Sequence, residues 1–109
     1  MADVIKVLGQ VDPAATTTTT LYTAPNLNQT TVSSLVVCNR TGHQRTFRVS
    51  VHVDDATADD KQFLYYDSIM AAHTTFSAVL GLTLNQGDVI KVYADDVGLS
   101  FNMFGVETS

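Results

Sequence analysis

The chain has 109 residues, a length that suits one domain with one hydrophobic core. Hydrophobic residues make up 45% of it, which argues against disorder and against a need for a metal or disulfide to hold the fold. The net charge of −5, with only 16% charged residues, argues against binding to nucleic acid or to an anionic membrane surface.

The first twenty residues are predicted to form an N-terminal arm and a loop. Val4 to Leu8 predicts a short strand within an arm, Met1 to Val11, that either closes its own sheet or adds to a neighbour's. The run Thr16 to Thr20 predicts a loop that becomes a second strand, Thr19 to Thr23, because Thr favours β-structure. The chain opens with an acid and not with the basic region of a secretory signal, so we expect no leader and synthesis inside a cell.

The next strand is predicted over Thr31 to Cys38, where β-branched and apolar residues dominate. Its end is apolar on both faces, so we expect a central place in a sheet and a buried Cys38 thiol that resists alkylation until the protein unfolds. As the single cysteine, Cys38 cannot form an intramolecular disulfide, which fits a cytoplasmic folding compartment.

The clearest alternation of apolar and polar residues runs from Thr46 to Val53, after a hairpin turn at Asn39 to His43. A period of two predicts one face toward the core and one toward water. The core face is predicted to hold Phe47, Val49, Val51 and Val53. The water face is predicted to hold Thr46, Arg48, Ser50 and His52.

Four weaker strands follow after an acidic loop, Asp54 to Asp60. They are predicted over Gln62 to Ser68, Thr74 to Leu80, Asp88 to Ala94 and Leu99 to Met103. Ile69 to His73 is consistent with one helical turn at most. Asp88, Asp95 and Asp96 flank one strand and are expected to terminate it.

Together these segments predict an all-β protein. About eight short strands, with turns every 8 to 12 residues, indicate one antiparallel β-sandwich or jelly-roll-like domain over residues 1–109. Two sheets packed face to face would cover the apolar side of every strand. The strand order cannot be read from the sequence, so a jelly roll and an immunoglobulin-like sandwich both stay open.

No catalytic, cofactor or metal site is predicted. His43, His52 and His73 lack the spacing of metal ligands, and His52 is expected to be exposed. The acidic stretch lacks the EF-hand pattern, which favours a solvated loop over a calcium site. No nucleophile elbow or Gly-rich phosphate loop is present, and Glu107 is the only glutamate. We therefore expect a non-enzymatic protein.

Several segments of the sequence resemble segments of small virion structural proteins of tailed bacteriophages. They are Leu21 to Pro25 with Thr31 to Ser34, Val37 to Gly42 leading into Phe47 to Val51, Leu84 to Tyr93, and Leu99 to Glu107. The set covers most of residues 21–107 and carries no catalytic residue. The resemblance implies a virion β-sandwich used as capsid cement or decoration, or as a tail, baseplate or fibre module.

We interpret the chain as a capsid cement or decoration protein in the virion. The expected partners are the major capsid protein or other virion proteins, and the expected state is a homo-oligomer, a trimer or a dimer. Contacts are predicted in the arm Ala2 to Gln10 and in the loops Asp12 to Thr20 and Asn39 to Gln44. The residues singled out are Val4, Ile5, Lys6, Val7, Leu8, Pro13, Thr16, Thr18, Arg40, His43, Tyr65 and Tyr66.

The alternative is a tail or fibre-attachment module. An aromatic platform for sugars could be formed by Tyr22, Tyr65, Tyr66 and Tyr93, although tyrosines of small sandwiches more often pack between core and rim. A host glycan would then bind through Tyr65, Tyr66 or Tyr93. A small enzyme of unknown type ranks last.

Overall fold

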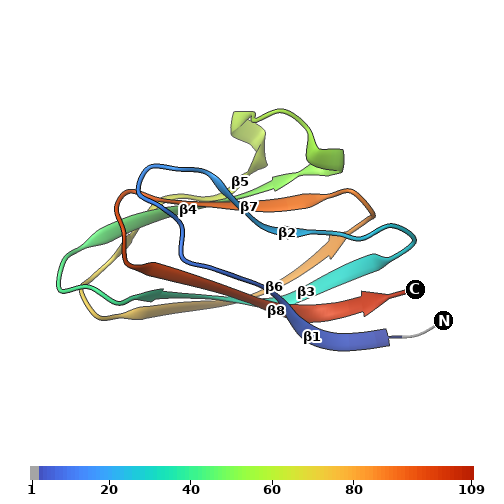
Figure 1. Ribbon diagram of the computed structural model, residues 1–109, viewed down its shortest axis with the longest axis horizontal. Coiled ribbons are helices and arrows are strands. Elements are labelled where there is room, and N and C mark those ends of the chain that lie inside the picture. The colour runs from blue at the N-terminus through green and yellow to red at the C-terminus, as the bar shows by residue number, and fades with distance from the viewer. Residues whose placement is uncertain (1–2) are drawn as a thin grey trace.

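The computed structural model describes residues 3–109, which fold into a sandwich of two four-stranded antiparallel sheets (Figure 1). The strands are β1 (Asp3–Val11), β2 (Thr19–Thr23), β3 (Gln29–Asn39), β4 (Arg45–His52), β5 (Phe63–Met70), β6 (Thr75–Leu84), β7 (Val89–Ala94) and β8 (Leu99–Thr108). One sheet has the order β1-β8-β3-β6 and the other β2-β7-β4-β5. Within the described part of the chain, no helix is long and apolar enough to cross a membrane.

The pairing of the strands identifies a jelly roll. β1 pairs with β8, β2 with β7, β3 with β6 and β4 with β5, so the two halves of the chain run alongside each other in reverse order. The β3–β8 and β4–β7 pairs complete the two sheets. This wrapping of one long hairpin is the jelly-roll topology. The predicted antiparallel β-sandwich is confirmed, and the strand order excludes the immunoglobulin-like alternative.

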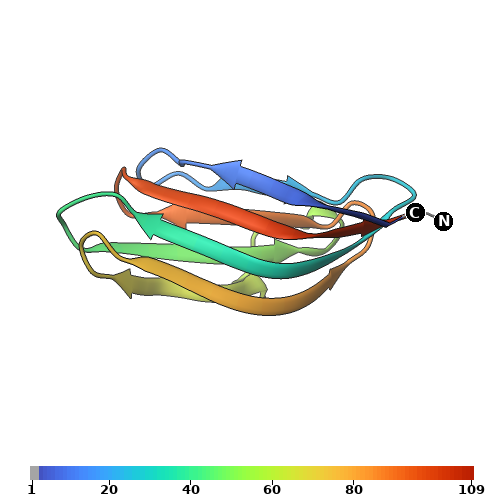
Figure 2. The same ribbon diagram turned by 90° about the horizontal axis from the view of Figure 1, so that it is seen from below.

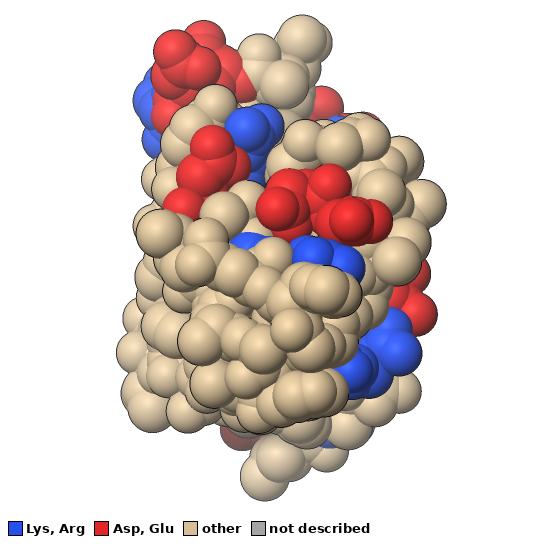
Figure 3. All heavy atoms as spheres, turned by 90° about the vertical axis from the view of Figure 1, so that its left-hand side faces the viewer, with Lys and Arg blue, Asp and Glu red and all other residues tan. Residues whose placement is uncertain are grey.

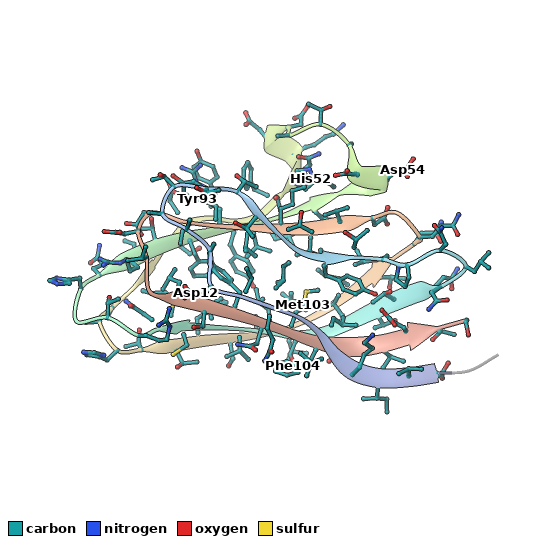
Figure 4. All side chains as sticks on the ribbon, viewed as in Figure 1. Asp12, His52, Asp54, Tyr93, Met103 and Phe104 are labelled. Carbon is teal, nitrogen blue, oxygen red and sulfur yellow. The ribbon has the colours of Figure 1, made fainter. Side chains whose placement is uncertain are left out.

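The core lies between the sheets and is centred on aromatic rings. Phe47 of β4 contacts Phe101 of β8 and Phe76 of β6, with ring centroids 6.0 and 5.5 Å apart. The period of two of each strand places its apolar residues here. In Figure 4, the adjacent residues Met103 and Phe104 of β8 point to opposite sides of their sheet, Met103 inward and Phe104 outward.

β4 departs from its predicted alternation at its end. Phe47 and Val49 are buried as expected, but His52 is buried too, whereas Val53 is 68% exposed. The predictions of an exposed His52 and an inward Val53 are therefore wrong. Register shifts between β4 and β5 and a 3-10 turn at Val53–Asp55 fold the following segment back over the sheet, which covers His52 and leaves Val53 in solvent.

The helical turn considered for Ile69 to His73 is wrong as well. β5 continues through Met70, whose side chain is buried, and a non-helical turn follows. Short 3-10 turns form instead at Val53–Asp55 and Asp60–Gln62, in the segment predicted to be an acidic loop. Asp59 caps the second turn, accepting a hydrogen bond from the Lys61 backbone.

The N-terminal arm closes its own sheet. β1 pairs with β8 of the same chain from Asp3 opposite Thr108 to Val11 opposite Phe101, with a bulge between Val7 and Gly9. Leu8 points into the core and is 9% exposed. Of the two roles open to the arm, the structure thus assigns the internal one, and β1 becomes an edge strand.

A polar contact joins the sheets where β2 crosses β8. The buried Tyr22 hydroxyl donates to the Glu107 carboxylate at 2.6 Å and lies 2.7 Å from Thr30 Oγ1, which then acts as the donor of that pair. Lys6 holds the other Glu107 oxygen at 3.3 Å. The hydrogen bond from Tyr22, more than the one from Lys6, lowers the pKa of Glu107. Burial and then Glu107 raise the pKa of Tyr22 to about 12.

This contact predicts a dependence of stability on pH. Because the pKa of Glu107 is lower in the fold, its contribution is present above its ordinary value of 4.5 and is lost as the pH falls through the folded pKa. Because the pKa of Tyr22 is raised, its contribution is present below 10.0 and is lost as the pH rises toward about 12.

Tyr22→Phe is expected to lower the free energy of unfolding by about 1.5–3 kcal/mol near neutral pH, the usual contribution of a hydrogen bond to a charged group. It should also flatten both limbs of the stability profile. Urea denaturation between pH 3 and pH 11 measures this. An unchanged profile in Tyr22→Phe would show that the contact contributes nothing to folding.

Candidate interaction surfaces

Two loops selected from the sequence meet at one end of the sandwich. This end carries the segments between β1 and β2, β3 and β4, β5 and β6, and β7 and β8 (Figure 1). Arg40 forms an ion pair with Asp12 at 2.8 Å and donates to Ser100 Oγ at 2.8 Å. The Thr16 amide donates to the Ala94 carbonyl. The loops 12–18 and 40–44 are thus linked by contacts within the chain.

The predicted contact residues of these loops differ in exposure. Thr16, Thr18, Arg40 and His43 are exposed, whereas Pro13 is buried. Figure 3 looks onto this end and shows charged side chains in its upper and right-hand parts above a broad uncharged area.

Asn39 fixes the loop that carries Arg40 and His43, and sequence reasoning missed its role. The Asn39 side chain is 1% exposed. Its amide donates to the carbonyls of His43 and Ala71, at 2.9 and 3.1 Å, and its oxygen accepts from the Thr41 amide. An Asn at the start of a turn is the available signal, because its side chain replaces backbone hydrogen bonds there. The loop is consequently pre-ordered.

The tyrosines do not form the aromatic platform considered from the sequence, because Tyr22 is buried and the others point to different sides. Tyr65 points into the core, 5.8 Å from Phe47 and 5.3 Å from Phe76 between ring centroids. Tyr66 and Tyr93 lie on the outer side of their sheet with Arg48 between them, its guanidinium 4.3 and 4.4 Å from the two ring centroids. Asp67 accepts from Arg48 at 2.7 Å. Tyr66, Arg48 and Tyr93 therefore form one stacked, internally paired cluster.

His52 lies beneath the 53–62 segment in a small apolar pocket (Figure 4). Its Nδ1 donates to the Ala56 carbonyl at 2.9 Å, because a carbonyl only accepts, and its Nε2 lies 2.8 Å from Ser50 Oγ. The bond to Ala56 holds the segment on the sheet, and the bond to Ser50 fixes the ring on β4. Over residues 3–109, no group of three or more His, Cys, Asp or Glu side chains is placed to hold a metal ion.

The outer face of the β1-β8-β3-β6 sheet is a surface that spans four strands. The cross-strand register places these residues on it, and we call the set the neutral face: Ile5, Val7, Gln10, Thr31, Ser34, Val36, Cys38, Thr75, Ser77, Val79, Thr83, Ser100, Asn102, Phe104 and Val106. Each member is uncharged. Among the described residues, charged groups adjoin it only at its ends, with Asp3 at one and the Asp12–Arg40 pair at the other.

Apolar side chains run across the middle of the neutral face. Val7, Phe104, Ser34 and Val79 are aligned across the four strands, and Ile5 lies in the next row beside Val106. Ile5 is 86% exposed and Val79 91%. The outer side of the second sheet differs, because it carries the Arg48–Asp67 and Lys91–Asp55 ion pairs and is partly covered by the 53–62 segment. Exposed apolar side chains on a broad uncharged surface make the neutral face a candidate interaction site.

The remaining predicted contacts on β1 lie on different sides of the strand. Ile5 and Val7 are on the neutral face. Lys6 points to the opposite side, where it bonds Glu107, and Val4 is opposite Glu107 in the register. Leu8 is part of the core. The sequence predicted contacts in this strand as part of an N-terminal arm able to add to a neighbour's sheet, and did not identify the face that the strand helps to form.

Cys38 is on the neutral face and is partly exposed, so the prediction of a buried core thiol is wrong. Leu35 and Val37 take the inward positions of β3, and Val36 and Cys38 the outward ones. We expect iodoacetamide to alkylate Cys38 in the folded protein without denaturant. Intact-protein mass spectrometry measures this, with urea-unfolded protein as the reference. A native protein that stays unlabelled would contradict the outward orientation.

The sequence matches no family model and no curated protein. The fold is similar to a chain in the crystal structure of the T13 particle of infectious bursal disease virus, with a TM-score of 0.52 and 12% identity over 96% of this chain. It is also similar to a chain in the structure of the Gx strain of that virus, with a TM-score of 0.51 and 13% identity over 97% of this chain. This protein spans only about 30% of the length of either viral chain. At this identity, the likeness shows a shared jelly-roll fold.

Proposed function

We propose that this protein is a non-catalytic structural component of a virion, and more narrowly a bacteriophage capsid cement or decoration protein. It sits on the head as a symmetric oligomer, between major capsid subunits. It stabilises the head because it binds the assembled shell and not the free subunit.

The neutral face carries this proposal. A chain with a net charge of −5 keeps one broad sheet face free of charge, so that face can be buried without desolvating ions. Interface cores are likewise depleted of charged residues. The likeness to chains of a virus particle supports a virion role, since jelly rolls are a recurrent architecture of capsid proteins.

Immunogold electron microscopy of purified particles tests the location. Antibody against the recombinant protein is applied to particles of the phage that encodes it. Gold over the head supports the cement function. Gold confined to the tail would replace it by the tail or fibre alternative, and particles without gold would overturn a virion role.

Binding to particles that lack the protein tests the surface. Ile5→Lys and Val36→Lys place a charge on the neutral face and are each expected to weaken binding at least tenfold. Leu27→Lys is the matched control, because Leu27 is 87% exposed and lies in the turn after β2, away from the neutral face. Equal binding by all three variants would show that another surface docks on the shell.

The tail or fibre alternative is favoured by one observation, the stacked Tyr66–Arg48–Tyr93 cluster on the second sheet. Aromatic rings of this kind can bind sugars through their faces. A glycan array with the wild type and Tyr66→Ala tests it. Sugar binding that Tyr66→Ala abolishes would favour host attachment, and a silent array would count against it.

A further inference from the structure

The four edge strands of the sandwich differ in how well they are protected against pairing with another strand. An unpaired edge is a template for strand addition unless charge, shortness or a bulge blocks it. β1 contains Lys6 and a bulge between Val7 and Gly9. β2 has five residues and a register shift. β5 has two register shifts against β4 and contains Asp67, with a φ of 51°.

β6 carries few of these protections. Its ten residues, Thr75–Leu84, include no charged residue and no proline. Thr75 to Val79 pairs regularly with β3, from Cys38 to Ser34, and the irregularity of the strand is confined to the two residues that follow. Figure 2 shows β6 at the lower margin of its sheet, with no strand beyond it.

Apolar side chains accompany the open edge of β6. Phe76, Leu80 and Leu82 pack against the core but are only partly buried. Val79, on the neutral face, is 91% exposed. A strand added here would therefore cover apolar surface in addition to pairing the backbone.

We infer that a second copy of this chain pairs its β6 antiparallel with this β6, over Thr75 to Val79 and about a two-fold axis. The two four-stranded sheets then form one continuous sheet, and the two neutral faces become one surface. In this register Ser77 lies opposite its own symmetry mate, Phe76 opposite the small Ala78, and Thr75 opposite Val79. The inference names one pairing that could build the symmetric oligomer of the proposed function, but it concerns the protein alone in solution and does not rest on that function.

The net charge of the chain and the area that a stable interface needs both favour a second copy of this chain as the partner of β6. Each copy carries a net charge of −5, so two copies repel unless they meet where acids are absent, and β6 with its neighbouring face is such a place. A two-fold contact requires a segment that is complementary to itself, as an uncharged antiparallel strand is. Stable interfaces bury about 800 Å² per partner. The molecule measures 45 × 28 × 19 Å, so its larger sides have room for that area.

The mass of the purified full-length protein in solution tests the inference. Sedimentation equilibrium is expected to give twice 11.8 kDa for the wild type. Ser77→Lys and Ser77→Asp each place like charges opposite each other across the axis, and each is expected to weaken the dimer at least tenfold. A mixture of the two variants is expected to restore the dimer, because Lys then faces Asp.

Thr20→Lys, on the β2 edge, is the matched control and is expected to stay dimeric. Ser77 and Thr20 are both exposed, and circular dichroism of each variant verifies the fold. A wild type that is monomeric up to about 100 µM overturns the inference. So does a dimer that persists in both Ser77 variants, or a mixture of the two that stays monomeric. None of these outcomes depends on particles, so failure here is distinct from failure of the cement function.

Discussion

Replacing Phe47 with alanine is expected to lower the free energy of unfolding by about 3–5 kcal/mol. Phe47 is 1% exposed, and its ring contacts Phe101 and Phe76 of the opposite sheet and Tyr65 of its own. Truncation removes the contact that joins four strands and leaves a cavity that rigid sheets cannot close. Domains of this size are stable by about 5–15 kcal/mol, so the variant is expected to be at the margin of folding.

Urea denaturation followed by circular dichroism measures this loss. Phe63→Ala is the matched control, because Phe63 is only partly buried and packs on Tyr66 at the outer side of β5, with ring centroids 4.9 Å apart. We expect it to cost at most about 1.5 kcal/mol, the scale of an aromatic pair. If the two substitutions cost the same, the Phe47 cluster is not the centre of the core.

The strands were predictable because most have one buried face. β7 from Ile90 onward and the first half of β8 keep a strict alternation, in which Ile90, Val92, Phe101 and Met103 are inward. The order of the strands within the sheets was not predictable, because the sequence of one strand does not identify the strand with which it pairs. The pairing of β1 with β8 joins residues about a hundred positions apart, and only the complete wrapping of the chain decides it.

Bulges account for most of the local errors. In β6, the strand was predicted to end at Leu80, whereas it continues to Leu84 with its alternation of exposed and more buried residues intact. The premature end coincides with Gly81, which has a φ of +62° and lies where the register with β3 shifts. In β4, register shifts and the returning 53–62 segment bury His52, which the alternation alone would expose.

The neutral face was not predictable for a different reason. It is assembled from β1, β8, β3 and β6, and Ser34, Phe104 and Val79 are neighbours there only through cross-strand register. The sequence shows that charged residues are few, but it does not show that they lie on surfaces other than the neutral face. The contact of Arg48 with Tyr66, and not with Tyr65, was not predictable either. The two tyrosines are adjacent in the sequence, so the sequence does not show which of them lies on the outer side of the sheet.

Gly105→Ala is expected to destabilise the protein by about 3 kcal/mol, the upper range for overpacking. In an ordinary strand the same change is favourable by about 0.5–1 kcal/mol, because glycine loses more conformational freedom on folding. Here the added methyl would meet the backbone oxygen of Thr31 in β3 and lie 2.9 Å from Leu8 Cδ1 of β1. Gly105 lies between these two strands, opposite Lys6 and Val32, so its backbone cannot move away without breaking one of the pairings.

The prediction is tested by whether Gly105→Ala lowers or raises the free energy of unfolding. Gly42→Ala is the control, because its methyl would have His73 Nε2 at 3.6 Å as its neighbour, an ordinary contact. It is expected to be neutral or to stabilise by up to about 1 kcal/mol. Thermal and urea unfolding of both variants measure the difference. Gly105→Ala as stable as Gly42→Ala would mean that β8 does not lie closely between β1 and β3. In that case the register that aligns Ile5, Val106 and Thr31 on the neutral face would be wrong.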